Sequence, residues 1–167
     1  PCSSSIAPVI SGHLARAGAT LTSEIVEVEV RRALEWLEGE RSAHQRHAAV
    51  LILRELAEST PTLFSSHVQG FLTLIWVALR DPREHIRDAA IQALRACLVL
   101  IAQRDVKWRN QWYEKVFLEV QNGFKSDTAL SIHGSLLTIS KLTMLSVAGC
   151  FDLRYSHAYP LCRRTAS

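Results

Sequence analysis

The sequence predicts an all-α protein made of stacked, antiparallel helix pairs. Three observations lead to this prediction. Apolar residues recur every three or four positions over long stretches. Helix-capping motifs divide these stretches into separate helices, and the pattern of residues returns after about 41 positions. The 48% of hydrophobic and 21% of charged residues are typical of a globular chain that is long enough to bury a sizeable core.

The first helix is predicted over residues 24–38. Its apolar residues are mostly three or four positions apart, which gives one apolar stripe, and Gly39 follows as a stop signal. The segment "IVEVEV" at 25–30 also alternates like a strand, but its continuation "RRALEWL" favours a helix. Residues 1–21, which mix Ser, Gly and Ala with short apolar patches, are a poorly defined N-terminal segment.

Two further helices are predicted at 43–58 and 61–80. Ser42 and Gln45 have the spacing of a capping box, in which each side chain accepts a hydrogen bond from a backbone N–H group at the helix start. Thr60 and Pro61 predict a second helix start, because proline at the first helical position loses no hydrogen bond. Gly70 is the expected weak point of the 61–80 helix.

The fourth helix, predicted at 82–104, is preceded by residues that are typical of a helix start. Asp81 is interpreted as the cap, Pro82 as the first turn, and Glu84 as the partner in a capping box. Small alanines farther along this helix allow a neighbouring backbone to approach closely. Two more helices, at 109–123 and 130–147, complete an array of about three helix pairs over residues 22–147, and residues 148–167 form an irregular or disordered tail.

The internal repeat identifies the residues that the helix pairs share. An offset of 41 residues aligns a set of positions that begins at Arg46 with a set that begins at Arg87. An offset of 45 residues aligns Gly134, in a weaker third copy, with Ala89. Two-helix repeats of about 40–47 residues are typical of HEAT and armadillo solenoids, in which repeated residues serve packing. Asp81 and Arg87 are therefore interpreted as cap and inter-helix or inter-repeat salt-bridge residues instead of ligand contacts. The aligned repeat positions are Arg46, Ala48, Ala49 and Leu53, then Arg87, Ala89, Ala90 and Leu94, then Gly134.

Charge, hydropathy and cysteine usage restrict the kinds of partner and compartment. The net charge of +3 is far below that of a dedicated nucleic-acid binder. The longest uninterrupted apolar runs, such as "LIWVAL", are much shorter than the ~20 residues of a membrane span, so we expect none. Scattered cysteines indicate a reducing, cytoplasmic compartment. The start at Pro1, without a signal peptide, predicts a piece of a longer protein.

Candidate metal ligands form no convincing motif. His44 and His47 are three positions apart, but "HQRH" lacks the glutamate and the spacing of a zinc-protease motif, and Arg46 would repel a cation. We interpret the two histidines as a solvated pair at a helix start. Three other residues of ligand type are scattered in the tail and give a weak signal: Cys150, His157 and Cys162. No metal site is predicted.

Catalytic elements are also missing from the pattern. The sequence has no Gly-rich phosphate loop, no P-loop, and no "HRD"-like or "DFG"-like element. Nucleophilic catalysis would need a Ser or Cys held against a base, and no strand-turn-helix elbow is predicted to present one. We therefore predict no catalytic residues, no cofactor-binding residues and no enzyme activity for this chain.

Aromatic and basic residues alternate near the start of the 109–123 helix. Trp108 and Trp112 lie among Lys107, Arg109 and Lys115, which is compatible with a stacking surface for single-stranded nucleic acid. The interpretation that we favour is that Trp112 anchors a helix in the solenoid, together with Phe117.

Several long strings make the sequence resemble the N-terminal HEAT region of the target of rapamycin (TOR) kinases. They are "VEVEVRRALEWL", "QRHAAVLILRELAESTPTLF", "DPREHIRDAAIQALRACLVL", "QWYEKVFLEVQNGF" and "IHGSLLTI", and the resemblance covers about residues 21–145. It implies a scaffold segment of a large Ser/Thr kinase of the phosphatidylinositol-kinase-related class, active in nutrient and growth signalling. The implied partners are the remaining TOR solenoid and a Raptor-type regulatory subunit, in a complex associated with endomembranes.

Two alternatives to this scaffold remain open from the sequence. One is a free-standing HEAT or armadillo adaptor that binds a protein or peptide, and the other is a nucleic-acid-binding helical array. The 130–147 helix is apolar around most of its circumference and has one charged residue, Lys141. Since end repeats of a solenoid need polar outer faces, we expect that other protein elements cover this helix.

Overall fold

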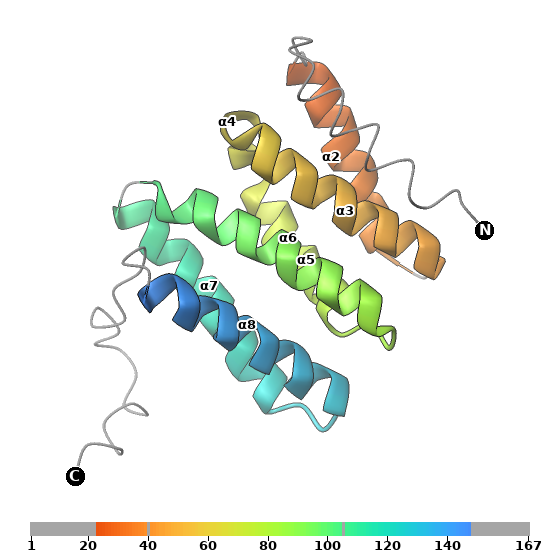
Figure 1. Ribbon diagram of the computed structural model, residues 1–167, viewed down its shortest axis with the longest axis vertical. Helices are drawn as coiled ribbons and strands as arrows, with labels where there is room; N and C mark the ends of the chain where they lie inside the picture. The colour runs from red at the N-terminus through yellow and green to blue at the C-terminus, as the bar shows by residue number, and fades with distance from the viewer. Residues whose placement is uncertain (1–22, 40, 105, 148–167) are drawn as a thin grey trace.

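The computed structural model describes residues 23–39, 41–104 and 106–147, and every regular element in these residues is a helix (Figure 1). The all-α prediction is confirmed, and the strand-like alternation at 25–30 lies inside the first helix. The predictions for residues 1–21 and 148–167 lie outside the described residues. The elements are α2 (Ser23–Leu37), α3 (Ala43–Ser59), α4 (Pro61–Phe64), the 3-10 turn η1 (Ser65–His67), α5 (Val68–Leu79), α6 (Glu84–Ala102), α7 (Val106–Phe124) and α8 (Ala129–Val147).

The helices form antiparallel pairs that stack in two layers. The pairs are α2 with α3, α5 with α6, and α7 with α8, and each pair makes extensive contacts. Helices α3, α6 and α8 lie side by side in one layer, with α5 and α7 behind α6 and α8 (Figure 1). In the second layer α2 contacts α5. This is the arrangement of a HEAT-type solenoid.

Helix α6 is the centre of the core, because it contacts α3, α5, α7 and α8. Its buried face includes Ile86, Leu94, Leu98 and Ile101, all at most 1% exposed. Complete burial of one such side chain stabilises the folded state by about 1.5–3 kcal/mol. Cys97 is also fully buried there, and burial raises the pKa of its thiol far above the ordinary value. This thiol packs as a small apolar side chain.

The predicted capping box at the start of α3 is confirmed. The backbone N–H of Gln45 donates to Ser42 Oγ over 3.3 Å, and the backbone N–H of Ser42 donates to Gln45 Oε1 over 3.2 Å. Pro61 occupies the first position of α4 as predicted, but the Thr60 hydroxyl does not cap that helix. It donates instead to the carbonyl oxygen of Leu56 over 2.8 Å and so closes the end of α3.

The prediction of one continuous helix over 61–80 is wrong. The 3-10 turn η1 separates α4 from α5, and the hydroxyls of Ser65 and Ser66 donate to carbonyl oxygens three residues earlier, over 2.7 and 3.0 Å. Such side-chain bonds compete with the regular helical pattern. Gly70 is not the break. A Cβ atom there would lie 3.2 Å from Leu34 Cδ1, so this glycine lets α5 approach α2.

The predicted start of the 82–104 helix also needs correction. Helix α6 begins at Glu84, and the cap position is Arg83, which has an extended backbone and no side-chain cap bond. Asp81 Oδ1 accepts from the backbone N–H of Arg83 over 2.9 Å, which holds the turn before the helix. The box with Glu84 does not form because the Asp81 carboxylate is committed to this turn and to α3.

By length and composition alone, the segment Pro61–Leu79 could cross a membrane, although its uninterrupted apolar runs are short. Within the described part of the chain, one helical segment meets these criteria of length and composition. Phe71, Ile75 and Leu79 are fully buried where α5 contacts α2 and α6. Packing inside the array therefore explains the apolar composition of this segment.

Ala90 gives a direct test of the close contact between α3 and α6. Its side chain is fully buried, so Ala90→Leu should overpack the contact and lower the free energy of unfolding by about 1–3 kcal/mol. The matched control is Ala129→Leu at the exposed start of α8, which should change it by less than about 0.5 kcal/mol. Urea unfolding followed by circular dichroism measures both variants. An unchanged midpoint for Ala90→Leu would contradict the assignment.

Candidate functional site: the contacts between helix pairs

A salt bridge joins the first helix pair to the second. Arg46 Nε on α3 lies 2.7 Å from Asp81 Oδ2 in the turn before α6. The Asp81 side chain is 1% exposed and that of Arg46 is 17% exposed, so the pair is largely shielded from solvent screening. Arg46 also donates to the carbonyl oxygen of Arg41. The salt bridge fixes the start of α3 against the start of α6.

Arg87 occupies the repeat position that corresponds to Arg46, and it makes the same backbone contact. Its guanidinium donates to the carbonyl oxygens of Asp81 and Pro82, over 2.9 and 3.0 Å. Arg41 and Pro82 each lie five residues before their arginine, so the repeated arginine holds the corner of its own helix pair. The Nε atom of Arg87, however, is buried without a hydrogen-bond partner among the described residues. The salt bridge is therefore not repeated between the second and third pairs.

Small side chains allow α3 and α6 to approach closely. Ala90 and Ala93 are fully buried on α6, and Ala89 is 8% exposed beside them. On α3, the repeat positions Ala49 and Leu53 are fully buried, whereas Ala48 is half-buried. Leu94 completes the buried repeat positions on α6. Contacts between α3 and α6 are the most extensive between any two elements of the described residues.

Two glycines allow close contacts in the third helix pair, one with the second pair and one between its own helices. A Cβ atom on Gly134 would lie 2.9 Å from the carbonyl oxygen of Leu79, which is too close for any side chain. The absence of a side chain thus seats α8 against the end of α5. Gly123 on α7 makes a similar contact, since its Cβ atom would overlap Ser135 Oγ at 2.0 Å. The boundary between the second and third pairs thus rests on the backbone approach at Gly134, on apolar packing and on the exposed ion pair of Arg80 with Glu119.

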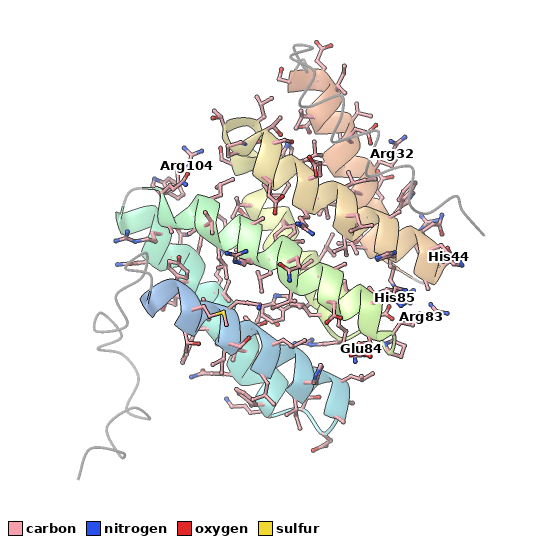
Figure 2. The ribbon with its side chains drawn as sticks, in the orientation of Figure 1. Arg32, His44, Arg83, Glu84, His85 and Arg104 are labelled. Carbon is pink, nitrogen blue, oxygen red and sulfur yellow. The ribbon has the colours of Figure 1, made fainter. Side chains whose placement is uncertain are left out.

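Histidines gather at the end of the array where α3 and α6 begin, and Figure 2 labels His44 and His85 there. The rings of His47 and His85 meet edge to face, with centroids 5.0 Å apart. Burial, and then the nearby His85 and His44, lower the pKa of His47. Among the described residues, no group of three His, Cys, Asp or Glu side chains could hold a metal ion. The weak candidates Cys150, His157 and Cys162 lie outside that part.

The aromatic residues at the start of α7 have different environments. Tyr113 is 5% exposed, and its hydroxyl lies 3.5 Å from the carbonyl oxygen of Leu98, so it anchors α7 to α6. Trp112 is half-buried, with Lys115 Nζ 4.6 Å from the centre of its ring. Trp108 is 58% exposed. The sequence did not single out Tyr113 as the buried anchor, because alternating aromatic and basic residues do not indicate which side of the helix faces the core.

Large apolar side chains remain exposed on three surfaces. On α2 these are Ile25 and Val28, and on α5 and α7 they are Val77, Trp108 and Leu118. On α8 they are Leu136 at 53% and Met144 at 63% exposed, together with Leu130 and Ile132 at 37% each. Apolar patches of this kind mark interaction sites.

Comparison with known proteins places the two-helix repeat in a wider context. A family described as "HEAT-like repeat" matches residues 43–96, from the start of α3 to late in α6. The chain is 47% identical over 138 residues to "Serine/threonine-protein kinase TOR" of Arabidopsis thaliana, which covers 82% of the chain. It is 41% identical over 133 residues to "Serine/threonine-protein kinase tor1" of Schizosaccharomyces pombe, which covers 80%. For "Serine/threonine-protein kinase mTor" of Drosophila melanogaster, the identity is 35% over 153 residues and 83% of the chain. The chain spans about 6% of the length of each relative.

Removing the Asp81 carboxylate should destabilise the fold strongly. Asp81→Ala leaves the Arg46 guanidinium unpaired in a mostly buried place, and the expected loss is about 2–4 kcal/mol of unfolding free energy. The control Arg54→Ala breaks a pair with Glu58 in which both side chains are more than 40% exposed, and it should cost less than about 0.5 kcal/mol. Urea unfolding measures both values, and equal losses would show that the Asp81 pair has no special role.

Acid should weaken the fold partly through His47. Its folded-state pKa lies below the ordinary value of 6.5, so the unfolded chain takes up this proton first as the pH falls. The contribution of neutral His47 to the free energy of unfolding is therefore complete above about pH 6.5 and decreases as the pH falls below that value. His47→Gln should make the urea midpoint fall less between pH 7.5 and 5.5. The control His133→Gln, at an exposed position on α8, should leave that fall unchanged.

Proposed function

Because the chain belongs to the target of rapamycin (TOR) protein kinases, of which it matches a HEAT-repeat segment, we propose that it is a protein-interaction scaffold. The matched segment is a helical repeat, so this chain is not the catalytic part of such a kinase. The proposed role is to hold protein partners within a complex of nutrient and growth signalling. The proposed partners are the remaining TOR solenoid and a Raptor-type regulatory subunit.

The exposed apolar surface of α8 carries the proposal. Leu136 and Met144 are more than half exposed, although they lie on a helix whose other side is fixed to α7, α6 and α5. In a solenoid, each helix pair buries the apolar face of its neighbour, and burial of a leucine contributes about 1.5–3 kcal/mol. A further helix pair or a partner subunit packed on α8 would gain this energy.

The alternative function is a free-standing adaptor for a protein or peptide, which could use the same groove between α5 and α7 that is described below. A nucleic-acid-binding array has less support, because a net charge of +3 is weak for such a role. We also propose a cytoplasmic location, which microscopy of the tagged chain would test. A signal confined to a membrane-bounded lumen would contradict it.

Substitution of Leu136 tests the scaffold proposal. Leu136→Glu places a charge in the α8 surface and should abolish association through it. The wild-type chain should self-associate as its concentration rises, and it should bind an immobilised, purified Raptor-type subunit or the solenoid segment that follows the matched region in a TOR relative. Light scattering after size exclusion measures the first property, and surface plasmon resonance measures the second.

The control for this experiment is Leu118→Glu on α7, where the leucine is equally exposed at 52%, against 53% for Leu136. It should leave association through α8 unchanged. A wild-type chain that stays monomeric at every concentration and binds neither probe would overturn the scaffold proposal in favour of the free-standing adaptor.

A further inference from the structure

A groove lies between α5 and α7 in the second layer, and the end of α6 also lines part of it. It consists of two recesses, of about 630 Å³ and 320 Å³, that share Gln69 as a lining residue. Residues near Gln69 lie opposite Trp112, whereas Arg80 at the other end of α5 lies 3.6 Å from Glu119. The two helices are thus parallel along the groove. At 1.5 Å per residue, the stretch from Gln69 to Arg80 gives a length of roughly 17 Å.

The groove has an apolar floor and an apolar rim. Leu72, Trp76 and Val116 line it and are at most 5% exposed. Val77 and Leu118 also line it but are 44% and 52% exposed. In the adjoining recess Trp108, at 58% exposed, has the same rim position. These three rim side chains have large apolar surfaces that nothing in the described residues covers, and contact with a partner would bury them.

Basic residues exceed acidic ones along the groove. Its charged lining residues are Arg80, Arg104 and Lys115 against Glu119 alone, an excess of two positive charges (3 − 1). Arg80 is paired with Glu119, and Lys115 lies over the Trp112 ring. Arg104 is exposed and forms no salt bridge to a described residue. Figure 2 shows it at the end of the array opposite to His44 and His85. This charge complements an acidic partner and disfavours a basic one.

We propose that the groove between α5 and α7 binds an acidic peptide segment of a partner protein, anchored by large apolar side chains. The proposal rests on the scaffold function and deepens it, because it locates a second surface, separate from α8, and states the chemistry of its partner. One apolar anchor would fill the larger recess over Leu72 and Trp76, and another would fill the smaller recess beside Trp108. Carboxylates would lie near Arg104 and Lys115, whose exposed positive charges favour an acidic partner.

Peptide is favoured over single-stranded nucleic acid by the character of the lining. Nucleic-acid grooves combine a track of cations with a series of exposed aromatic rings. Here one ring, that of Trp108, is largely exposed, Trp112 is half-buried, and the floor is aliphatic apart from Trp76. Tryptophan and arginine are also the side chains most enriched at the energetic centres of protein interfaces.

Selection from a random peptide library tests the proposal on the full chain. Phage that display random 12-residue peptides should yield sequences with net negative charge and at least two large apolar residues. One selected peptide, labelled with fluorescein, is then titrated with each variant and followed by anisotropy. Leu118→Glu and Trp108→Ala should each weaken its binding at least tenfold, and Arg104→Glu should weaken it and remove most of the salt dependence.

The matched control is Leu136→Glu, which should change peptide binding less than twofold. It also separates the two proposals, because it disables association through α8 without touching the groove, whereas Leu118→Glu does the opposite. Helix content and the thermal midpoint are measured for each variant. If Leu118→Glu does not fold, the two other groove variants carry the test, since Trp108 and Arg104 are exposed.

Several results would overturn the groove proposal. One is a selection that enriches no sequence, or only neutral or basic ones. A second is binding that Leu136→Glu weakens while all the groove variants leave it intact. A third is tight binding of a labelled 15-residue oligothymidine that depends on Trp108 and competes with the peptide, which would assign the groove to nucleic acid. The second result would move the peptide site to the α8 surface, and the other two leave the α8 proposal untouched.

Discussion

The arrangement of the helix pairs depends on one buried carboxylate. Asp81 is 1% exposed, and a charge so far from water is tolerated only if partners satisfy it. Arg46 supplies the opposite charge from α3, and the backbone N–H of Arg83 supplies a hydrogen bond within the turn. The start of α3 can therefore take one position relative to the start of α6. In that position α3 and α6 make the most extensive contact between any two elements of the described residues.

The second boundary of the stack has no buried charge pair among the described residues, because its ion pair, Arg80 with Glu119, joins side chains that are 32% and 42% exposed. Gly134 brings α8 against the end of α5 through backbone contact, and Arg87 Nε has no partner there. Within the second layer, α2 contacts α5, whereas α5 and α7 are separated by the groove that Trp76 and Trp112 line. The groove thus lies at the joint of the array that has an exposed ion pair in place of a buried one.

Local signals in the sequence predicted the helices well, because caps and apolar periodicity act within a few residues. Ser42 with Gln45 is such a case, and the 41-residue offset identified Ala90 and Leu94 as buried repeat positions. The role of Asp81 needed long-range information: the same residue suits a local cap, and its partner is 35 positions away. The α5–α7 groove escaped prediction for the same reason, since helix separation depends on the tertiary arrangement. The break at 65–67 escaped prediction for a different reason: its serine bonds span three residues, but a similar local bond, that of Thr73, leaves α5 intact.

The unequal joints give the stack an uneven stiffness. Rotation between the first two pairs would pull Arg46 away from Asp81 and expose a charged group to an apolar surrounding, so this joint resists bending. The joint between the second and third pairs is held by apolar packing, backbone contact and one exposed ion pair, and the energy of these contacts changes more gradually with angle. A mechanical load along the array would therefore bend this joint first. Because α5 and α7 lie on either side of the joint, bending would change the width of the groove between them. A partner bound in the groove would then favour one curvature of the solenoid, and a change in curvature would in turn change how well the groove binds that partner.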